Sequence, residues 1–87
     1  MPTPAIIERV RELHAELGET QPNPATQADL EALTRQLETV LVEPTSVPHY
    51  AGLRDKLLFA YVGFEVHHPK LAGLVQGVAT QLAAAGL

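Results

Sequence analysis

The stretch LLFAYVGFEVHHPK, residues 57–70, decides the fold class of this 87-residue chain. It is the centre of a longer segment, residues 49–67, whose apolar side chains recur at the spacing of one helix face: Tyr50, Leu53, Leu57, Ala60 and Phe64. A further apolar set falls on a second side of the same helix: Leu58, Phe59, Val62 and Val66. We expect a helix that is apolar on two sides to be buried between its neighbours.

A β-strand is the competing interpretation of this segment, because phenylalanine, tyrosine and valine favour strands. The alternation of apolar and polar residues that is typical of a half-buried strand is absent, however. Gly63 would also weaken a strand, since glycine has no side chain to pack. The helix is therefore the preferred prediction.

The proline that follows the two histidines predicts where this helix ends. Proline disfavours the helical conformation of the residue before it, so the helix should end near His67 and leave His68 outside helical geometry. Pro69 suits the first position of a new helix, predicted over residues 69–86. The start of that helix has unpaired N–H groups and a partial positive charge, and Glu65 is placed to reach these amides or the His68 ring. We expect Glu65, His68 and Pro69 to form a structural joint rather than an active site.

The last predicted helix has one apolar face and an opposite face of small residues. The apolar face carries Leu71, Leu74, Val75, Val78, Leu82 and Ala85, and the opposite face carries Gly73, Gly77, Thr80 and Ala84. No charged residue follows Lys70, although an exposed helix face normally carries charge. Small residues let another backbone approach closely, so Gly73, Gly77 and Ala84 are predicted contacts of a homo-oligomer, most simply a two-fold dimer.

Two further amphipathic helices are predicted in the first half of the chain, over residues 4–17 and 24–43. Each has one apolar stripe: Ile6, Val10, Leu13 and Leu17 in the first, and Leu30, Leu33, Leu37 and Val40 in the second. Thr3 is the expected N-cap of the first helix, and Gly18 its expected left-handed stop. Either Asn23–Pro24 or Thr26 can begin the second helix, and Thr26 followed three residues later by Asp29 weakly imitates a capping box.

The predicted fold is all-α, with residues 1–87 as a single helical domain. Its helices, at about 4–17, 24–43, 49–67 and 69–86, would form a four-helix bundle or two helical hairpins. A chain of this size buries only roughly 60–65% of its unfolded surface, so we expect oligomerisation to complete the core.

Composition limits the partners and the location. Ten acidic residues outnumber six scattered basic ones, for a net charge of −4. Nucleic-acid binding depends on clustered lysine and arginine, so we expect no nucleic-acid partner. The chain has no cysteine, and neither a signal peptide nor a membrane span is predicted. The location predicted from these absences is cytoplasmic.

Familiar catalytic patterns are missing, including a Gly-rich phosphate loop, a nucleophile elbow and an H-E-x-x-H motif. We therefore predict no enzyme, no catalytic residue, no metal and no cofactor. The one pattern that suggests a metal is Glu65-x-x-His68, because di-iron bundles bind their ions with this spacing. A homodimer could supply a second copy, with Glu12 or Glu16 completing the set. A di-iron-like metal-binding protein is thus one alternative.

The preferred function is a non-enzymatic oligomerisation or protein-interaction module. The uncharged last helix and the two-sided helix before it support this prediction. A second alternative is an acidic regulator that binds a protein partner, and it rests on the net charge alone.

The C-terminal segment FEVHHPKLAGLVQGVATQLAAAGL, residues 64–87, resembles the signature of domain of unknown function 4404, a family of small bacterial proteins. Members of that family look like F-E-x-x-H-P-x-L-A, followed by an apolar helix that ends in glycine and an aliphatic residue. The matching positions are Phe64, Glu65, His68, Pro69, Leu71, Ala72, Gly86 and Leu87. The resemblance implies no reaction, ligand or catalytic residue.

Overall fold

The computed structural model describes residues 3–21 and 23–87, and these form four α-helices and no strand. The helices are α1 (Pro4–Glu19), α2 (Gln27–Val42), α3 (Val47–His67) and α4 (Pro69–Ala84). The predicted all-α class is confirmed, and the strand alternative for the third segment is wrong. No helix in the described part of the chain is both long and apolar enough to cross a membrane.

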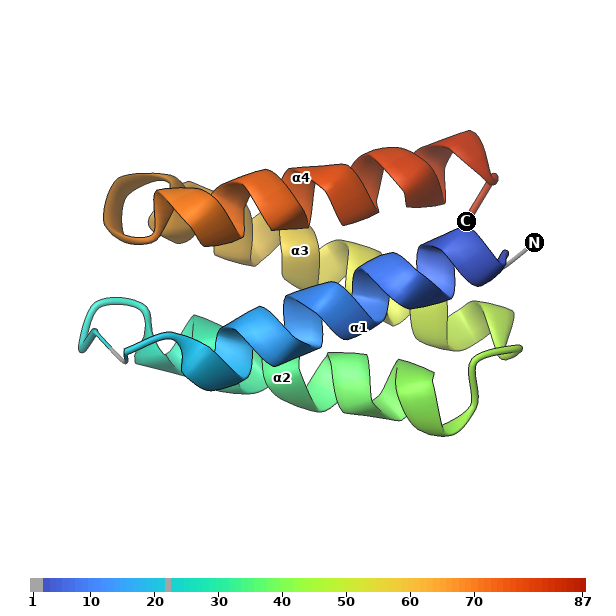
Figure 1. The fold of residues 1–87 in the computed structure, drawn as a ribbon, viewed down its shortest axis with the longest axis horizontal. Helices are drawn as coiled ribbons and strands as arrows, with labels where there is room; N and C mark the ends of the chain where they lie inside the picture. The colour runs from blue at the N-terminus through green and yellow to red at the C-terminus, as the bar shows by residue number, and fades with distance from the viewer. Residues whose placement is uncertain (1–2, 22) are drawn as a thin grey trace.

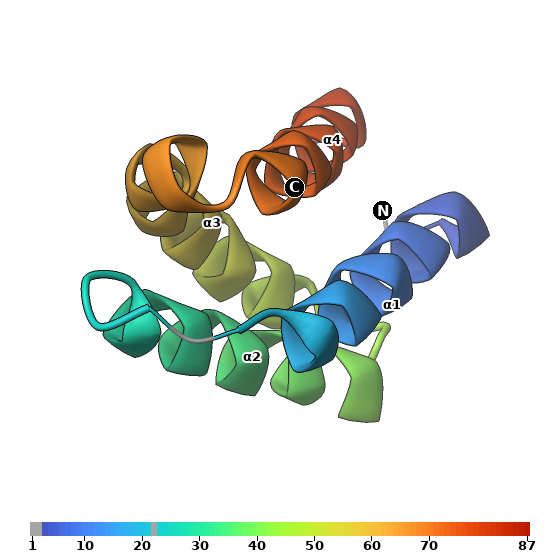
Figure 2. The same cartoon turned by 60° about the vertical axis from the view of Figure 1, so that its left-hand side comes forward.

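The four helices run alternately up and down (Figure 1). Each packs against the next one along the chain, and α1 closes the ring by packing against α4. The α1–α2 and α3–α4 turns lie together at one end, while the α2–α3 turn lies at the other end with the start of α1 and the C-terminus. Figure 2 shows the two hairpins, α1 with α2 and α3 with α4, facing each other across the core.

The predicted apolar stripes form that core. Side chains buried in it come from every helix: Ile6, Val10, Leu13, Leu17, Leu30, Leu33, Leu37, Val40, Tyr50, Leu53, Leu57, Ala60, Phe64, Leu71, Ala72, Val75, Val78 and Leu82. Tyr50 is fully buried, and its hydroxyl donates a hydrogen bond to the carbonyl of Pro44 at 2.6 Å. Burial raises the pKa of Tyr50 above its ordinary value, because a buried site disfavours the charged phenolate.

The start of α1 agrees with its sequence signals, but its end does not. The Thr3 side chain accepts a hydrogen bond from the N–H of Ile6, and Pro4 is the first helical residue, where no N–H is needed. The helix then continues through Gly18 to Glu19. The expected left-handed stop at Gly18 is wrong, because the helix ends instead where the Thr20 hydroxyl donates to the carbonyl of Glu16 at 2.7 Å.

The starts of two later helices need comment. The second helix starts at Gln27, directly after Thr26, the later of the two expected starts. The earlier start, near residue 24, is wrong because Asn23 closes a turn: its side-chain oxygen accepts from the N–H of Ala25, and its carbonyl accepts from the N–H of Thr26. The third helix starts at Val47 rather than near residue 49. Pro48 is accepted in its first turn, because the N–H that proline lacks would have no partner there.

The chain ends in a Schellman motif. Gly86 adopts a left-handed conformation with φ of 75°, which glycine accepts without steric cost. The N–H of Leu87 donates to the carbonyl of Leu82, and the N–H of Gly86 donates to that of Ala83. Leu87 thereby packs against the core as the last apolar contact after α4.

Candidate functional site

His68 is the only residue between α3 and α4, and its backbone serves both helices. Its N–H donates to the carbonyl of Phe64 at 2.7 Å, and its carbonyl accepts from the N–H of Ala72 at 3.0 Å. Its φ of −140° and ψ of 73° lie outside the helical region, as a residue before proline requires. Pro69 then opens α4.

The His68 side chain links this joint to the other hairpin. Its Nε2 lies 2.9 Å from the hydroxyl oxygen of Thr26, at the start of α2. Thr26 is the buried polar residue of the described chain, at 1% exposure, and its hydroxyl also lies 3.4 Å from the carbonyl oxygen of Asn23. A hydroxyl has a single hydrogen, so it donates to one of these two partners, and the tautomer of His68 sets whether Nε2 donates to the Thr26 oxygen or accepts from it. The bond connects the two hairpin turns at one end of the bundle.

Aromatic packing and a glycine support the same contact. The ring of Phe64 meets that of His68 edge-on, with centroids 5.8 Å apart and an interplanar angle of 79°. Gly63 faces the start of α2, where an added Cβ would lie 3.5 Å from the Thr26 methyl and 3.7 Å from the Asp29 carboxylate. Thr26 therefore does not act as the side-chain cap expected of it, because its hydroxyl is used across the bundle.

Glu65 does not take the position predicted for it. Its side chain is exposed, and no hydrogen bond joins it to the α4 amides or to the His68 ring among the described residues. The carboxylate instead lies next to Tyr61, one turn back on the same helix. Its negative charge, followed by partial desolvation of the ring, raises the pKa of the Tyr61 hydroxyl. The helix turns Glu65 toward solvent because Phe64, its neighbour, faces the core.

The described residues of one chain do not form a metal centre. Within residues 3–21 and 23–87, no three histidine, aspartate or glutamate side chains lie close enough to share an ion. Glu16, which the di-iron alternative would use, forms an ion pair with Lys70, with Nζ and Oε1 3.3 Å apart. Glu65 and His68 face different surroundings, solvent for the first and Thr26 for the second.

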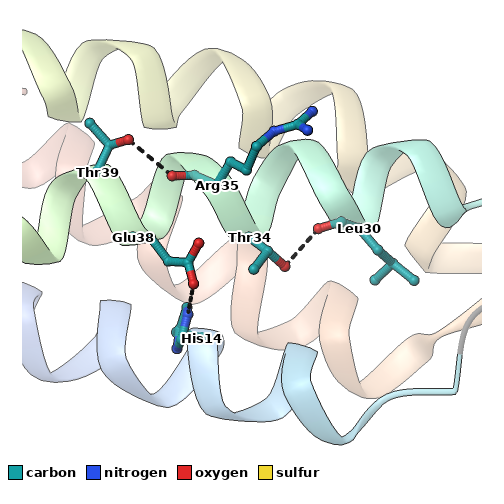
Figure 3. A network of polar contacts seen from close by, with 6 residues as sticks. All are labelled: His14, Leu30, Thr34, Arg35, Glu38 and Thr39. Atoms are coloured by element: carbon teal, nitrogen blue, oxygen red, sulfur yellow. Dashed lines mark hydrogen bonds and ion pairs between the residues drawn. The ribbon is translucent and has the colours of Figure 1, made fainter.

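The outward side of α2 carries a cluster of polar contacts (Figure 3). His14 Nε2 lies 3.4 Å from the Glu38 carboxylate, which links α1 to α2 at the surface. The hydroxyls of Thr34 and Thr39 donate to carbonyls one turn back on α2, those of Leu30 and Arg35. Exposed pairs of this kind contribute little to stability, and the two threonine hydroxyls are used within the helix.

The second apolar side of α3 is exposed, contrary to the expected burial. Leu58, Phe59, Val62 and Val66, called here the α3 stripe, are 61%, 78%, 71% and 74% exposed. The expectation is wrong for a single chain because α3 has two neighbours in the ring, α2 and α4, and both contact its inner half. Such large side chains contiguous on one helix face are typical of interaction surfaces.

A groove between α3 and α4 continues this surface. It is lined mainly by apolar side chains, and they come from both helices: Leu57, Leu58, Tyr61, Val62, Val75, Gln76 and Ala79. Residues of the α3 stripe form one wall of the groove. The apolar surface of the stripe is thus extended toward α4.

The small residues of α4 are exposed as well. Gly73, Gly77 and Ala84 lie on the outer face of the helix. No atom lies within 4 Å of a Cβ added at either glycine, so that face is open. A second groove runs beside it, between α4 and Arg9 of α1. The two glycines and Ala84 therefore lie together on one face, and the structure brings none of them to the His68 joint.

Sequence reasoning identified His68 and Pro69 but missed Thr26 as the partner of His68. The two residues are 42 positions apart, and a periodic pattern carries no signal for such a pairing. The threonine expected to cap the start of a helix is instead the buried partner of a distant histidine.

Comparison with known proteins identifies the family of this chain. Residues 6–87 match the family model described as a domain of unknown function (DUF4404). No curated protein and no solved structure has significant similarity to the chain. Because the match covers nearly the whole chain, the protein belongs to the DUF4404 family.

Proposed function

We propose that the protein is a non-enzymatic interaction module that associates through the outer side of α3, in the first place with itself. The observation that carries this proposal is the α3 stripe, four large apolar side chains that each have more than half of their surface exposed. Burying apolar surface stabilises a complex by about 25 cal/mol per Å². A helix presenting this stripe to water gains that free energy only when a partner covers it.

The composition of the stripe fits a protein partner. Aromatic side chains are enriched in protein–protein interfaces, and they supply a large part of the binding energy when a partner encloses them. Phe59 is the most exposed member of the stripe, at 78%. Neighbouring Tyr61 and Ala79 in the α3–α4 groove provide apolar surface into which a partner side chain fits.

Val62→Asp is the direct test of this proposal. It places a charge in the centre of the stripe, and we expect self-association to weaken by about 30-fold or more, since interface hot spots contribute on the order of 2 kcal/mol. Sedimentation velocity between about 1 and 100 µM measures the effect. The matched control is Val42→Asp, because Val42 is 86% exposed but lies at the end of α2. Wild-type protein that stays monomeric throughout this range, or equal loss in both variants, would contradict the proposal.

The small-residue face of α4 is the second surface in this proposal. Gly77→Leu meets no atom within 4 Å of the new Cβ, so the monomer should accept it and gain about 0.5–1 kcal/mol of helix stability. If another chain approaches this face closely, the leucine obstructs it, and we expect weaker assembly in a thermally more stable protein. Sedimentation measures the first effect, and thermal unfolding followed by circular dichroism measures the second.

Gly18→Leu is the matched control for that change. Gly18 is also an exposed helical glycine with nothing within 4 Å of an added Cβ, but it lies on α1. It should leave assembly unchanged. Unchanged assembly in Gly77→Leu as well would remove α4 from the interface and leave α3 as the contact.

A further inference from the structure

Two opposite charges flank the α3 stripe on the same edge. Arg54 and Glu65 are eleven residues apart, which is close to three full turns at 3.6 residues per turn, so they lie about 20° apart around the helix axis. Both are exposed. The edge they share faces α4. The guanidinium of Arg54 donates to the backbone oxygen of Leu87, just after α4, at 3.3 Å. Glu65 lies beside Tyr61, which lines the α3–α4 groove.

Neither charge has an oppositely charged side-chain partner among the described residues. The ion pairs of residues 3–21 and 23–87 join Arg9 to Glu12, Arg11 to Glu8, His14 to Glu38 and Lys70 to Glu16. Arg54 and Glu65 are separated along α3 by about 16 Å, at a rise of 1.5 Å per residue, which is too far for them to pair within one helix.

The midpoint between these charges falls at Phe59 and Ala60. The apolar stripe is densest there, since Leu58, Phe59 and Val62 all lie within one turn of that point. A two-fold axis perpendicular to the helix at this midpoint turns α3 onto an antiparallel copy of itself. This rotation places the α4-facing edge of one α3 beside the α4-facing edge of the other α3. Arg54 of each chain therefore comes opposite Glu65 of the other chain. The same axis brings the two Phe59 side chains together.

We propose that the partner of the α3 stripe is a second copy of this chain, bound antiparallel along α3, with reciprocal Arg54–Glu65 ion pairs on both sides of a Phe59 contact. The proposal rests on the proposed function, that the chain associates with itself through α3, and adds the orientation of the two chains and the ion pairs that set it. A parallel pair of α3 helices would leave each Arg54 about 16 Å from the nearest Glu65, so its charges would remain unpaired. The antiparallel pair brings Arg54 opposite Glu65 and one Phe59 against the other with a single axis, and two-fold dimers are the commonest homo-oligomers.

A stable interface covers about 800 Å² on each partner. That is about a sixth of the 5086 Å² of accessible surface on this chain. The four side chains of the stripe cover a smaller area than that. The α3–α4 groove, lined in part by Tyr61 and Ala79, adds apolar surface next to the stripe.

Charge reversal in two separate chains tests the pairing. Arg54→Glu alone places two glutamates opposite each other twice per dimer, and Glu65→Arg alone does the same with arginines. We expect each variant to dimerise about tenfold more weakly or worse, because like charges across an interface are repulsive.

An equimolar mixture of the two variants should recover assembly as a heterodimer. The introduced glutamate of one chain then faces the introduced arginine of the other, and the native Glu65 and Arg54 that remain also face each other. Sedimentation velocity at low and high salt measures this recovery, which should be smaller at high salt because salt screens exposed charges.

Lys56→Glu is the matched control. Lys56 is exposed on the same helix, but it lies on the edge that faces α2, together with Gly52 and Gly63. Its charge reversal should not change dimerisation by more than about twofold, since it has no opposite charge across the proposed axis.

Engineered cysteines test the orientation independently, in a chain that has no natural cysteine. Phe59→Cys should form an intermolecular disulfide, because the residue lies at the axis. Val66→Cys should not, because an antiparallel pair holds its two copies about 20 Å apart along the helix. One set of results would overturn the antiparallel pairing and leave the proposed function standing. In that case Val62→Asp abolishes the dimer, but mixing the charge variants does not recover assembly and Val66→Cys cross-links. A wild-type protein that is monomeric overturns both.

Discussion

Phe64→Ala is expected to lower the free energy of unfolding by about 3–5 kcal/mol, as large-to-small changes of core aromatics do. Phe64 has no exposed surface and is among the largest side chains of the core. Domains of this size are stable by only about 5–10 kcal/mol, so the loss should lower the melting temperature by roughly 15–30 °C. Urea unfolding followed by circular dichroism measures the change.

Phe59→Ala is the control, because the chain has only two phenylalanines and both lie on α3. Phe59 is 78% exposed, so its removal leaves no cavity in the fold. At concentrations below self-association its effect should stay within about 0.5 kcal/mol, as for other surface changes. A monomer that Phe59→Ala destabilises as much as Phe64→Ala would contradict the assignment of the inner and outer faces of α3.

Thr26→Val is the second substitution with a large expected effect. Valine keeps the shape of the side chain but removes the hydroxyl that His68 contacts at 2.9 Å. His68 is half-buried, so its ring left without this hydrogen bond costs about 1–2 kcal/mol, and the melting temperature should fall by roughly 5–15 °C. The double-mutant cycle with His68→Phe, which keeps an edge-on ring beside Phe64, should give a coupling of about 1 kcal/mol.

Thr39→Val is the matched control for this change. Its hydroxyl donates to the Arg35 carbonyl within the same exposed helix surface (Figure 3). The replacement should alter stability by no more than about 0.5 kcal/mol. Glu65→Ala should be equally mild, since the carboxylate is exposed and does not cap α4. Additive effects in the Thr26–His68 cycle would show that the two side chains stabilise the fold independently.

Local sequence signals predicted most of the fold. The apolar stripe of each helix, such as Leu13 with Leu17 and Leu33 with Leu37, is buried as its period implied. Helix starts at Thr3 and Pro69 were also predictable, because a cap and a proline act within one turn of the chain. Errors at the end of α1 and at the start of α2 occur where short turns, closed by the Thr20 and Asn23 side chains, compete with helix signals.

The candidate surface was predicted only in part. The sequence predicted that Gly73, Gly77 and Ala84 share the face of α4 opposite the core, where the structure exposes them, but it also predicted that the outer side of α3 would be covered. A pattern shows that two sides of a helix are apolar without showing how many neighbours the helix has. That number is a property of the whole ring of four helices, in which α3 meets α2 and α4 and leaves its remaining side open.

The sequence by itself determined the helical class, the faces that form the core and the break at Pro69, because helix period, capping and proline geometry act over a few residues. The tertiary structure alone decided that His68 binds Thr26 rather than Glu65, and that the α3 stripe is exposed. Both outcomes depend on which segments meet in space: the closed ring brings residues 26 and 68 together at one end of the bundle and leaves most of the surface of Phe59 and Val62 uncovered.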